Sequence, residues 1–390
     1  MTPSPAPSRR LTDAILIAIF VVAVSLPLIG QNMGLGGPTG KPQTVPPLRT
    51  AEASAWTFPD RFNTYYSDQF AFRPSLIRWH AKAKYLGLGV SPSETAMIGK
   101  DGWLYYAGDN CLDDYHTTLL TEPELAKWTS VMQARRDWLA ARNIRFLVVL
   151  VPDKHIVYPD YLPDAVHRAP GPYRMDQLAD HLRRHSTIEV LNLRPALEEA
   201  RKTERIYHKT DSHWNDRGAL VGYREIMNRV SAWFPNTKPL DRSAFTPVAR
   251  LGPGWDLTEM LGLQDVISEE DLSLDPRNAR RARVVRPLAE VRTKHWNDGL
   301  IITEVDDASL PRLVMLRDSF TSALVPFLAE HFHRAVFYWR SDFDIDTILK
   351  EHADVVIMEF GGRKFYQLAA FNPDDVTAAA AAPATRATQR

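Results

Sequence analysis

The sequence predicts an α/β fold with a mostly parallel sheet, preceded by one N-terminal transmembrane helix. Three observations lead to this prediction. Short apolar runs alternate with stretches of helical pattern, the run at 144–151 is continuously apolar apart from Arg145, and the run at 11–30 is long and apolar. Continuously apolar strands are typical of parallel sheets that are covered by helices on both faces.

The N-terminal run at 11–30 has three interruptions, Thr12, Asp13 and Ser25. About 20 such residues cross a bilayer, and Arg9 and Arg10 directly before them favour a cytoplasmic N-terminus. A cleaved signal peptide is the alternative, although Ser25-Leu26-Pro27-Leu28 is a poor cleavage site. We expect an uncleaved anchor over residues 1–30 and, in either case, an exported remainder.

Residues 31–85 are expected to link this anchor to the main domain. Their first part, 31–50, is rich in glycine and proline and predicts a tether. The second part carries aromatic residues among polar ones, which predicts one or two amphipathic helices that pack on the main domain. The main domain is expected over residues 86–375, and the Ala- and Thr-rich tail over 376–390 is expected to be frayed.

The main domain shows the alternation of strands and helices most clearly. Apolar runs predict strands at 144–151, 188–193, 313–316, 335–338 and 355–359. Helical patterns lie at 122–141, 173–184, 217–233 and 320–332. The stretch at 239–308 consists of short polar segments and is interpreted as an insertion.

Composition excludes several classes of function. The chain has 47 basic and 47 acidic residues, so its formal net charge of zero gives no electrostatic case for nucleic-acid binding. Cys111 is the only cysteine, which excludes an intrachain disulfide and a cysteine-rich metal site. We predict no metal, because His213 and His208 lack a convincing third ligand, and no cofactor.

Two clusters of residues indicate acyl chemistry. Ser319 follows the strand predicted at 313–316, and Asp211 and His213 lie upstream in Thr-Asp-Ser-His-Trp. A serine between a strand and a helix is a common nucleophile, and an imidazole, with its ordinary pKa of about 6.5, can accept and return a proton near neutral pH. Side chains two apart in an extended segment leave the same side, so Asp211 could orient His213. The backbone N–H of Ser319, helped by the dipole of the following helix, could stabilise an oxyanion.

The alternative for these clusters is helix capping. Asp318 and Ser319 could be the N-cap of the helix predicted at 320–332, and Asp211 or Asn215 could cap the next upstream helix. The two interpretations differ in whether the histidine and the serine meet in space.

Further polar residues follow the predicted strands. Functional groups gather at the carboxyl ends of strands in an open α/β sheet, so these residues are expected at one rim. Four of them are candidate substrate contacts: Lys154, Arg317, Glu359 and Arg363. The alternative is a surface charge for Lys154, Glu359 and Arg363, whereas Arg317 could bind an acidic sugar or crowd the serine turn.

On these residues the chain resembles the AlgX/AlgJ family of alginate O-acetyltransferases, which carry an SGNH-hydrolase-like domain. The resemblance covers roughly residues 60–370. It rests on the segments Asp101-Gly102-Trp103-Leu104-Tyr105-Tyr106, Val151-Pro152-Asp153-Lys154 with Tyr158-Pro159, Asn192-Leu193-Arg194-Pro195, Thr210-Asp211-Ser212-His213-Trp214-Asn215 and Asp318-Ser319-Phe320. Ordinary SGNH enzymes have the serine first, whereas this family resembles a permuted version with the serine last. One departure is Arg317, where the family pattern has glycine, and we find no equivalents of the SGNH glycine and asparagine of the oxyanion hole.

The resemblance implies a flavodoxin-like SGNH-hydrolase-type sandwich, with Ser319 as nucleophile, His213 as base and Asp211 as its partner. It also implies an O-acetyltransferase that modifies an exported polysaccharide beside a multi-spanning membrane acyltransferase. The expected location is the bacterial inner membrane, single-pass, with the catalytic domain in the periplasm. A carbohydrate acetyl esterase with the same triad and a non-catalytic glycan-binding scaffold of an exopolysaccharide secretion complex are the alternatives.

Overall fold

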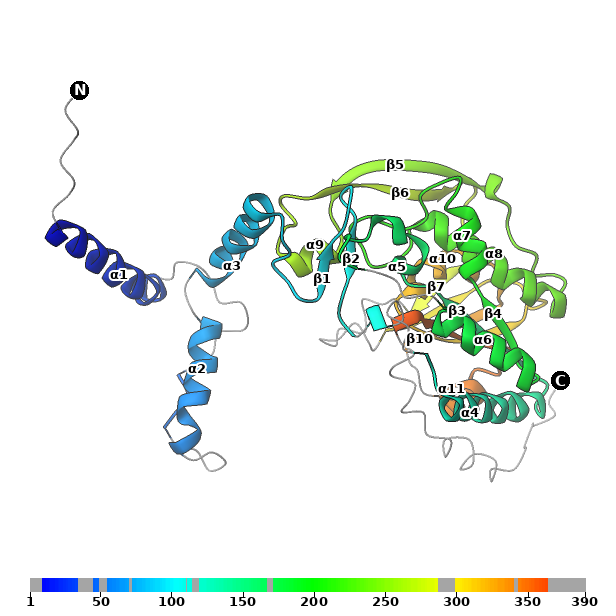
Figure 1. Cartoon of the computed structure of the whole chain (residues 1–390). Helices are drawn as coiled ribbons and strands as arrows, with labels where there is room; N and C mark the ends of the chain where they lie inside the picture. The colour runs from blue at the N-terminus through cyan, green and yellow to red at the C-terminus, as the bar shows by residue number, and fades with distance from the viewer. Residues whose placement is uncertain are drawn as a thin grey trace. The chain divides into compact units, whose positions relative to one another are not determined.

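The structure is a computed structural model and describes residues 9–33, 45–48, 55–69, 72–109, 111–113, 119–166, 171–286, 299–339 and 343–363. The chain divides into two units, Met1–Pro92 and Ser93–Arg390, whose elements are labelled in Figure 1. The predicted tail at 376–390 and most of the predicted tether at 31–50 lie outside the described residues.

The first unit is helical. It contains α1 (Arg9–Asn32), α2 (Phe58–Gln69) and α3 (Arg73–Lys82), and α3 continues into a π-helical turn at Ala83–Leu88. Helix α1 covers the predicted anchor, but none of the described helices combines the length and the apolar character that a membrane span requires. Helices α2 and α3 occupy the stretch in which one or two helices were predicted.

The second unit is built on one central sheet. Its described strands follow the order β4-β3-β11-β9-β10-β8-β7, with the bounds β3 (Arg145–Val151), β4 (Glu189–Asn192), β7 (Arg283–Arg286), β8 (Leu300–Glu304), β9 (Arg312–Arg317), β10 (Arg334–Trp339) and β11 (Val355–Gly361). The first five strands in this order pair in parallel, and β8 and β7 add an antiparallel edge. The sheet is therefore mixed and mostly parallel, which confirms the predicted α/β class.

Helices cover both faces of this sheet, as its buried apolar strands require. Figure 1 shows α4 (Glu122–Ala140), α6 (Arg174–His185) and α11 (Ile345–Lys350) on one side, and α7 (Arg194–Ala200), α8 (Asp216–Trp233) and α10 (Val325–Leu328) on the other. Helix α4 begins with a capping box, in which Thr121 and Glu124 satisfy each other's backbone amides. Helix α8 begins at Asn215, whose side chain accepts hydrogen bonds from the amides of Arg217 and Gly218.

The stretch interpreted as an insertion supplies both a hairpin and the edge of the sheet. Strands β5 (Phe245–Pro253) and β6 (Ser268–Pro276) pair in an antiparallel hairpin, with α9 (Asp256–Leu261) between them in the chain. The edge strands β7 and β8 follow. A smaller hairpin joins β1 (Ala96–Ile98) to β2 (Leu104–Tyr106). Most of the residues of β5 are exposed, although its composition is largely apolar.

The helix predicted at 320–332 is wrong. Residues there form a 3₁₀ turn at Phe320–Ala323, the short α10 and a second 3₁₀ turn at Ala329–His331. In a continuous helix over 320–332 Pro326 would lie in the interior, where it has no N–H for the i→i−4 hydrogen bond; in the structure it lies in the first turn of α10, where no such bond is made. The prediction that a helix dipole assists Ser319 is therefore also wrong, because a four-residue turn aligns few peptide dipoles.

Candidate active site

The residues that follow β3, β9 and β11 meet at one rim of the sheet. Strand β11, the last one among the described residues, lies between β3 and β9, so the carboxyl ends of these three strands are neighbours. The amide of Gly361 donates to Oδ2 of Asp318 at 2.8 Å, and Nε of Arg363 donates to Oδ1 of Asp153 at 3.2 Å. These contacts confirm the prediction of a shared rim.

Ser319, His213 and Asp211 form a continuous line of contacts at this rim. His213 Nε2 lies 2.6 Å from Ser319 Oγ, and His213 Nδ1 lies 2.7 Å from Asp211 Oδ1. The same Asp211 oxygen accepts a hydrogen bond from the backbone amide of His213 at 2.9 Å. With Nδ1 protonated and donating to Asp211, Nε2 is the acceptor that faces the serine hydroxyl. The structure therefore brings together the three residues that the sequence singled out.

Aromatic contacts hold the histidine segment against the serine turn. Trp214 is buried, its Nε1 donates to the backbone oxygen of Phe320 at 3.0 Å, and the two rings lie 5.4 Å apart. The His213 ring lies 4.8 Å from the Phe320 ring in an edge-on arrangement. The residues directly after the base and directly after the serine therefore pack together, which fixes the distance between the two side chains.

Hydrogen bonds and charge explain the electrostatics of Asp211. Burial alone would raise the pKa of this carboxyl, but the hydrogen bond from His213 and the charges of His213 and His208 hold it below its ordinary value. Asp211 is therefore ionised at neutral pH. An ionised carboxylate at Nδ1 can stabilise the imidazolium that forms when Nε2 accepts a proton.

The capping alternative holds for Asn215 and Asp318, but not for the side chains of Asp211 and Ser319. Asn215 caps α8, so Asp211 is not needed there. Asp318 Oδ1 accepts from the amide of Phe320 at 2.9 Å, and its other oxygen accepts from Gly361. Asp318 thus fixes the turn, while the side chain of Ser319 faces His213.

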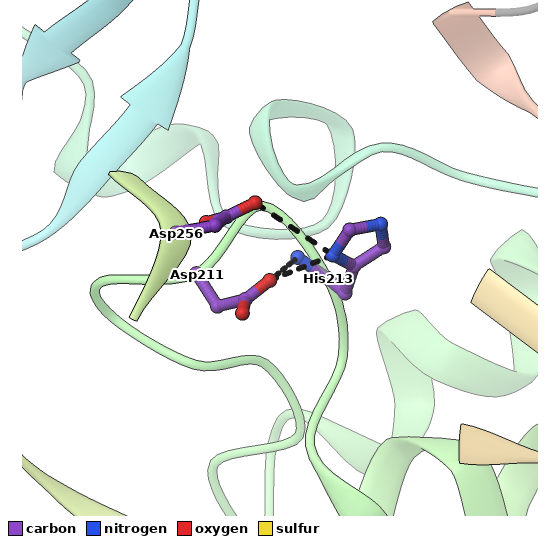
Figure 2. A group of neighbouring side chains, drawn as sticks. All are labelled: Asp211, His213 and Asp256. Carbon is purple, nitrogen blue, oxygen red and sulfur yellow. Dashed lines mark hydrogen bonds and ion pairs between the residues drawn. The ribbon is translucent and has the colours of Figure 1, made fainter. Parts of the chain in front are cut away.

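Asp256, at the start of α9, is a second carboxylate that sequence reasoning missed. Its two oxygens accept hydrogen bonds from the amide and the hydroxyl of Ser212 at 2.9 and 2.7 Å, and Oδ2 lies 3.9 Å from His213 Nδ1 (Figure 2). Burial, together with the charge of Asp211, raises the pKa of Asp256. Asp256 lies in the stretch interpreted as an insertion, where no pattern connected it with the histidine.

Asp211, His213 and Asp256 also have the spacing of metal ligands. Their ligand atoms all lie within 4.8 Å of one another. Each carboxylate is already engaged, because Asp211 accepts from His213 and Asp256 accepts from Ser212. Hydrogen bonding accounts for this cluster, and we assign no metal to it.

Three of the four predicted substrate contacts are buried, which does not fit that role. Lys154, Arg317 and Glu359 have exposed fractions of 3%, 1% and 2%. Lys154 Nζ donates to backbone carbonyls, among them that of Asp211 at 2.6 Å. The sequence placed these residues at the rim, but it could not indicate that their side chains point into the protein.

Arg317 and Glu359 form hydrogen bonds with the turn that carries Ser319. Arg317 donates to the backbone oxygen of Asp318 and to Ser322 Oγ, both at 3.0 Å, and its guanidinium lies 4.7 Å from the Trp339 ring centre. Glu359 Oε2 accepts from the amide of Asp318 at 3.0 Å and from the hydroxyl of Thr321 at 2.8 Å. Burial, together with the charge of Asp318, raises the pKa of Glu359 well above its ordinary value. Its surroundings therefore favour the protonated form of Glu359.

Arg363 lies closer to solvent than these three residues. Tyr106, Asp153, Ser212 and Arg363 are among the residues that line a narrow pocket. The guanidinium of Arg363 lies 4.9 Å from the Tyr106 ring centre and pairs with Asp153. Its role as a substrate contact stays a prediction.

A mixed α/β sheet that aligns a serine, a histidine and an aspartate at its carboxyl rim has the arrangement of nucleophile, base and orienting carboxylate that serine hydrolases and acyltransferases share. The family described as "SGNH hydrolase-like domain, acetyltransferase AlgX" matches residues 96–342, and the chain belongs to this family. This match confirms the resemblance predicted from the motifs.

Similarity to curated proteins supports the same family. The chain is 25% identical over 235 residues to the probable alginate O-acetylase AlgJ of Pseudomonas aeruginosa. These aligned residues cover 58% of this chain and 55% of that protein. The chain thus spans about half the length of the curated relatives it matches.

Two solved structures show the same fold. Bacillus cereus PatB1 is 17% identical with a TM-score of 0.50, and the likeness covers 68% of this chain and 95% of that chain. A DHHW family protein from Eubacterium siraeum is also 17% identical with a TM-score of 0.50, over 72% of this chain and 98% of that chain. At this identity the likeness concerns the fold alone.

Proposed function

We propose that this chain is an O-acetyltransferase that moves acetyl groups onto hydroxyls of an exported polysaccharide through an acyl-enzyme on Ser319. The observation that carries the proposal is the line of contacts from Asp211 through His213 to Ser319. Membership of an acetyltransferase family and similarity to a probable alginate O-acetylase support the acetyl group and the polysaccharide.

The first half-reaction loads the enzyme. Ser319 Oγ attacks the carbonyl carbon of an acetyl donor while His213 Nε2 takes the hydroxyl proton. The tetrahedral intermediate collapses, the bond to the donor's leaving group breaks, and His213 returns the proton to that group. The product is an acetyl ester of Ser319. Asp211 holds the imidazole with Nδ1 protonated and stabilises its charged form throughout.

The second half-reaction transfers the acetyl group. A sugar hydroxyl attacks the ester carbonyl, His213 takes its proton, and Ser319 leaves with that proton restored. We assign the backbone N–H of Ser319 to the oxyanion of both intermediates, where one donor contributes about 10²- to 10³-fold in rate. Transfer exceeds hydrolysis only when the sugar is held better than water, as a high effective molarity allows.

The setting we propose is the periplasmic face of a bacterial inner membrane. The apolar run at 11–30 and the preceding Arg9 and Arg10 support a single-pass anchor with an exported domain. A multi-spanning membrane acyltransferase would then supply acetyl groups from the cytoplasm. The partner and the location rest on the sequence pattern and on the family resemblance.

The test is an acetyl-transfer assay with the purified full-length chain. An activated acetyl ester serves as donor, acidic and neutral oligosaccharides serve as acceptors, and acetylated sugar is measured by mass spectrometry. Wild type should acetylate at least one acceptor and Ser319→Ala none, with Ser231→Ala on α8 as a matched serine control. Acetate release with no sugar product would favour an acetyl esterase. Equal transfer by Ser319→Ala would contradict the proposal.

A further inference from the structure

The segment that carries the catalytic histidine is held from one side by a buried lysine. Lys154, the first residue of the short helix α5 (Lys154–Val157), donates from Nζ to three backbone carbonyls. These are the carbonyls of His208 at 3.1 Å, Lys209 at 3.0 Å and Asp211 at 2.6 Å. One ammonium group therefore fixes the chain up to the residue that orients His213.

The same segment is held from the other side by a buried carboxylate. Glu269, on β6, accepts from the amides of Lys209 at 2.6 Å and Thr210 at 2.8 Å, and from the hydroxyl of Thr210 at 2.5 Å. Arg205 donates to Glu269 at 3.0 Å. Glu269 therefore accepts hydrogen bonds from the amides of this segment, while Lys154 donates hydrogen bonds to its carbonyls.

Both charges are buried at an energetic cost that only good partners offset. The exposed fractions are 3% for Lys154 and 4% for Glu269. The Lys154 ammonium also lies 5.2 Å from the Tyr105 ring centre. Burial lowers the pKa of Lys154 to about 7, but three carbonyl acceptors favour its protonated form. Burial opposes the charge of Glu269, yet the nearby His208 and the hydrogen bonds from Thr210 and Lys209 lower its pKa to about 2.

We propose that Lys154 and Glu269 are positioning residues for the acyl transfer: they form a clamp of opposite charges that fixes the backbone of residues 208–211 and so aims Asp211 and His213 at Ser319. The inference rests on the proposed function of that triad. It also gives the β5–β6 hairpin a role, because this hairpin supplies one half of the Lys154–Glu269 clamp.

The geometry explains why the clamp should act on the rate rather than on binding. Both side chains are almost fully buried, and their polar atoms are engaged by the segment 208–211, so they act on the site through this segment. Both bind backbone atoms within two residues of Asp211, whose carboxylate lies 2.7 Å from His213 Nδ1. A displacement of about 1 Å in a catalytic group can lower the rate about 10²-fold.

The test compares Lys154→Met and Glu269→Gln with wild type and Ser319→Ala, all as the full-length chain. Lys202→Met is the control, because Lys202 is largely exposed on the surface. Four quantities are measured: the thermal midpoint, kcat and KM for hydrolysis of an activated acetyl ester, and the downfield proton resonance of His213 Nδ1. Both clamp variants should lower kcat about 10²-fold with little change in KM, and should shift or broaden the Nδ1 resonance.

Two outcomes would overturn the clamp. One is a folded Lys154→Met or Glu269→Gln with wild-type kcat, and the other is an unchanged Nδ1 resonance despite lower activity. If both variants fail to fold, Thr210→Val decides, since it removes one Glu269 contact and leaves both charges. It should lower kcat with an unchanged KM, and wild-type kcat would refute the clamp. Equal activity of Ser319→Ala and wild type would instead refute the proposed function, while the Nδ1 resonance still tests the clamp.

Discussion

The Nε2 atom of His213 lies 2.6 Å from the Oγ atom of Ser319, although 106 positions separate the two residues in the chain. Two features of the fold create this distance. The serine follows β9 beside the centrally placed β11, and Trp214 packs on Phe320 directly behind the two reacting side chains. The alignment is therefore a property of the packed rim, and substitutions that disturb it should act in predictable ways.

Asp211→Asn should leave the fold intact and lower kcat about 10⁴-fold, because an amide at this position would favour the wrong imidazole tautomer. Asp256→Asn should have a much smaller effect, since its Oδ2 lies 3.9 Å from Nδ1, beyond hydrogen-bond distance. Steady-state hydrolysis of an activated acetyl ester measures both. A larger loss in Asp256→Asn than in Asp211→Asn would reverse the assignment of the orienting carboxylate.

Gly361→Ala should destabilise the protein by about 1–3 kcal/mol and reduce activity. A Cβ atom there would lie 2.8 Å from Asp318 Oδ2 and 3.0 Å from the Phe320 ring, so the serine turn must shift. Gly252→Ala on β5 is the matched control, because its Cβ would meet no atom within 4 Å. Chemical denaturation gives both values, and equal free energies of unfolding for the two variants would contradict this packing argument.

Glu359→Gln should change how stability depends on pH. The folded protein keeps the Glu359 proton at pH values where the unfolded chain has released it. The stabilisation is therefore complete below the ordinary glutamate pKa of about 4.5 and is lost as pH rises toward the raised pKa of the folded state. Relative to Glu359→Gln, wild type should lose stability from pH 4.5 to pH 8 in chemical denaturation. A constant difference across this range would show that Glu359 is ionised in the folded protein.

Chelation should leave activity unchanged. The proposed mechanism assigns hydrogen-bonding roles to Asp211, His213 and Asp256, although their ligand atoms lie within 4.8 Å of one another. Acetyl-ester hydrolysis is measured before and after exhaustive treatment with a chelator, with readdition of zinc and of magnesium. Loss of activity on chelation and recovery with one metal would mean that the cluster binds that ion in catalysis.

The sequence was sufficient to predict the α/β class, the strands of the parallel part and the three residues at the rim. These features depend on local patterns: buried strands are almost continuously apolar, as in 146–151, and the reactive residue types stand next to such runs. The helix expected at 320–332 failed because Pro326 breaks a pattern that otherwise has helical spacing.

The supporting residues could not be predicted in the same way. Glu269 and Asp256 come from a stretch of short polar segments, where a carboxylate has the appearance of a surface charge. Glu269 is buried and Asp256 is half-buried because both contact residues 209–212, which lie far away in the chain. Lys154 was placed at the correct rim, but strand position alone does not determine whether a side chain points outward or into the backbone behind the site.

The most direct test of the central claim is the intact mass of the full-length chain after brief exposure to an activated acetyl ester. The adduct is located by peptide mapping. The account predicts one acetyl group on Ser319 in wild type and none in Ser319→Ala, with faster discharge when an acceptor sugar is present. Wild type that never carries acetyl on Ser319 while it turns over the ester would contradict the acyl-enzyme mechanism.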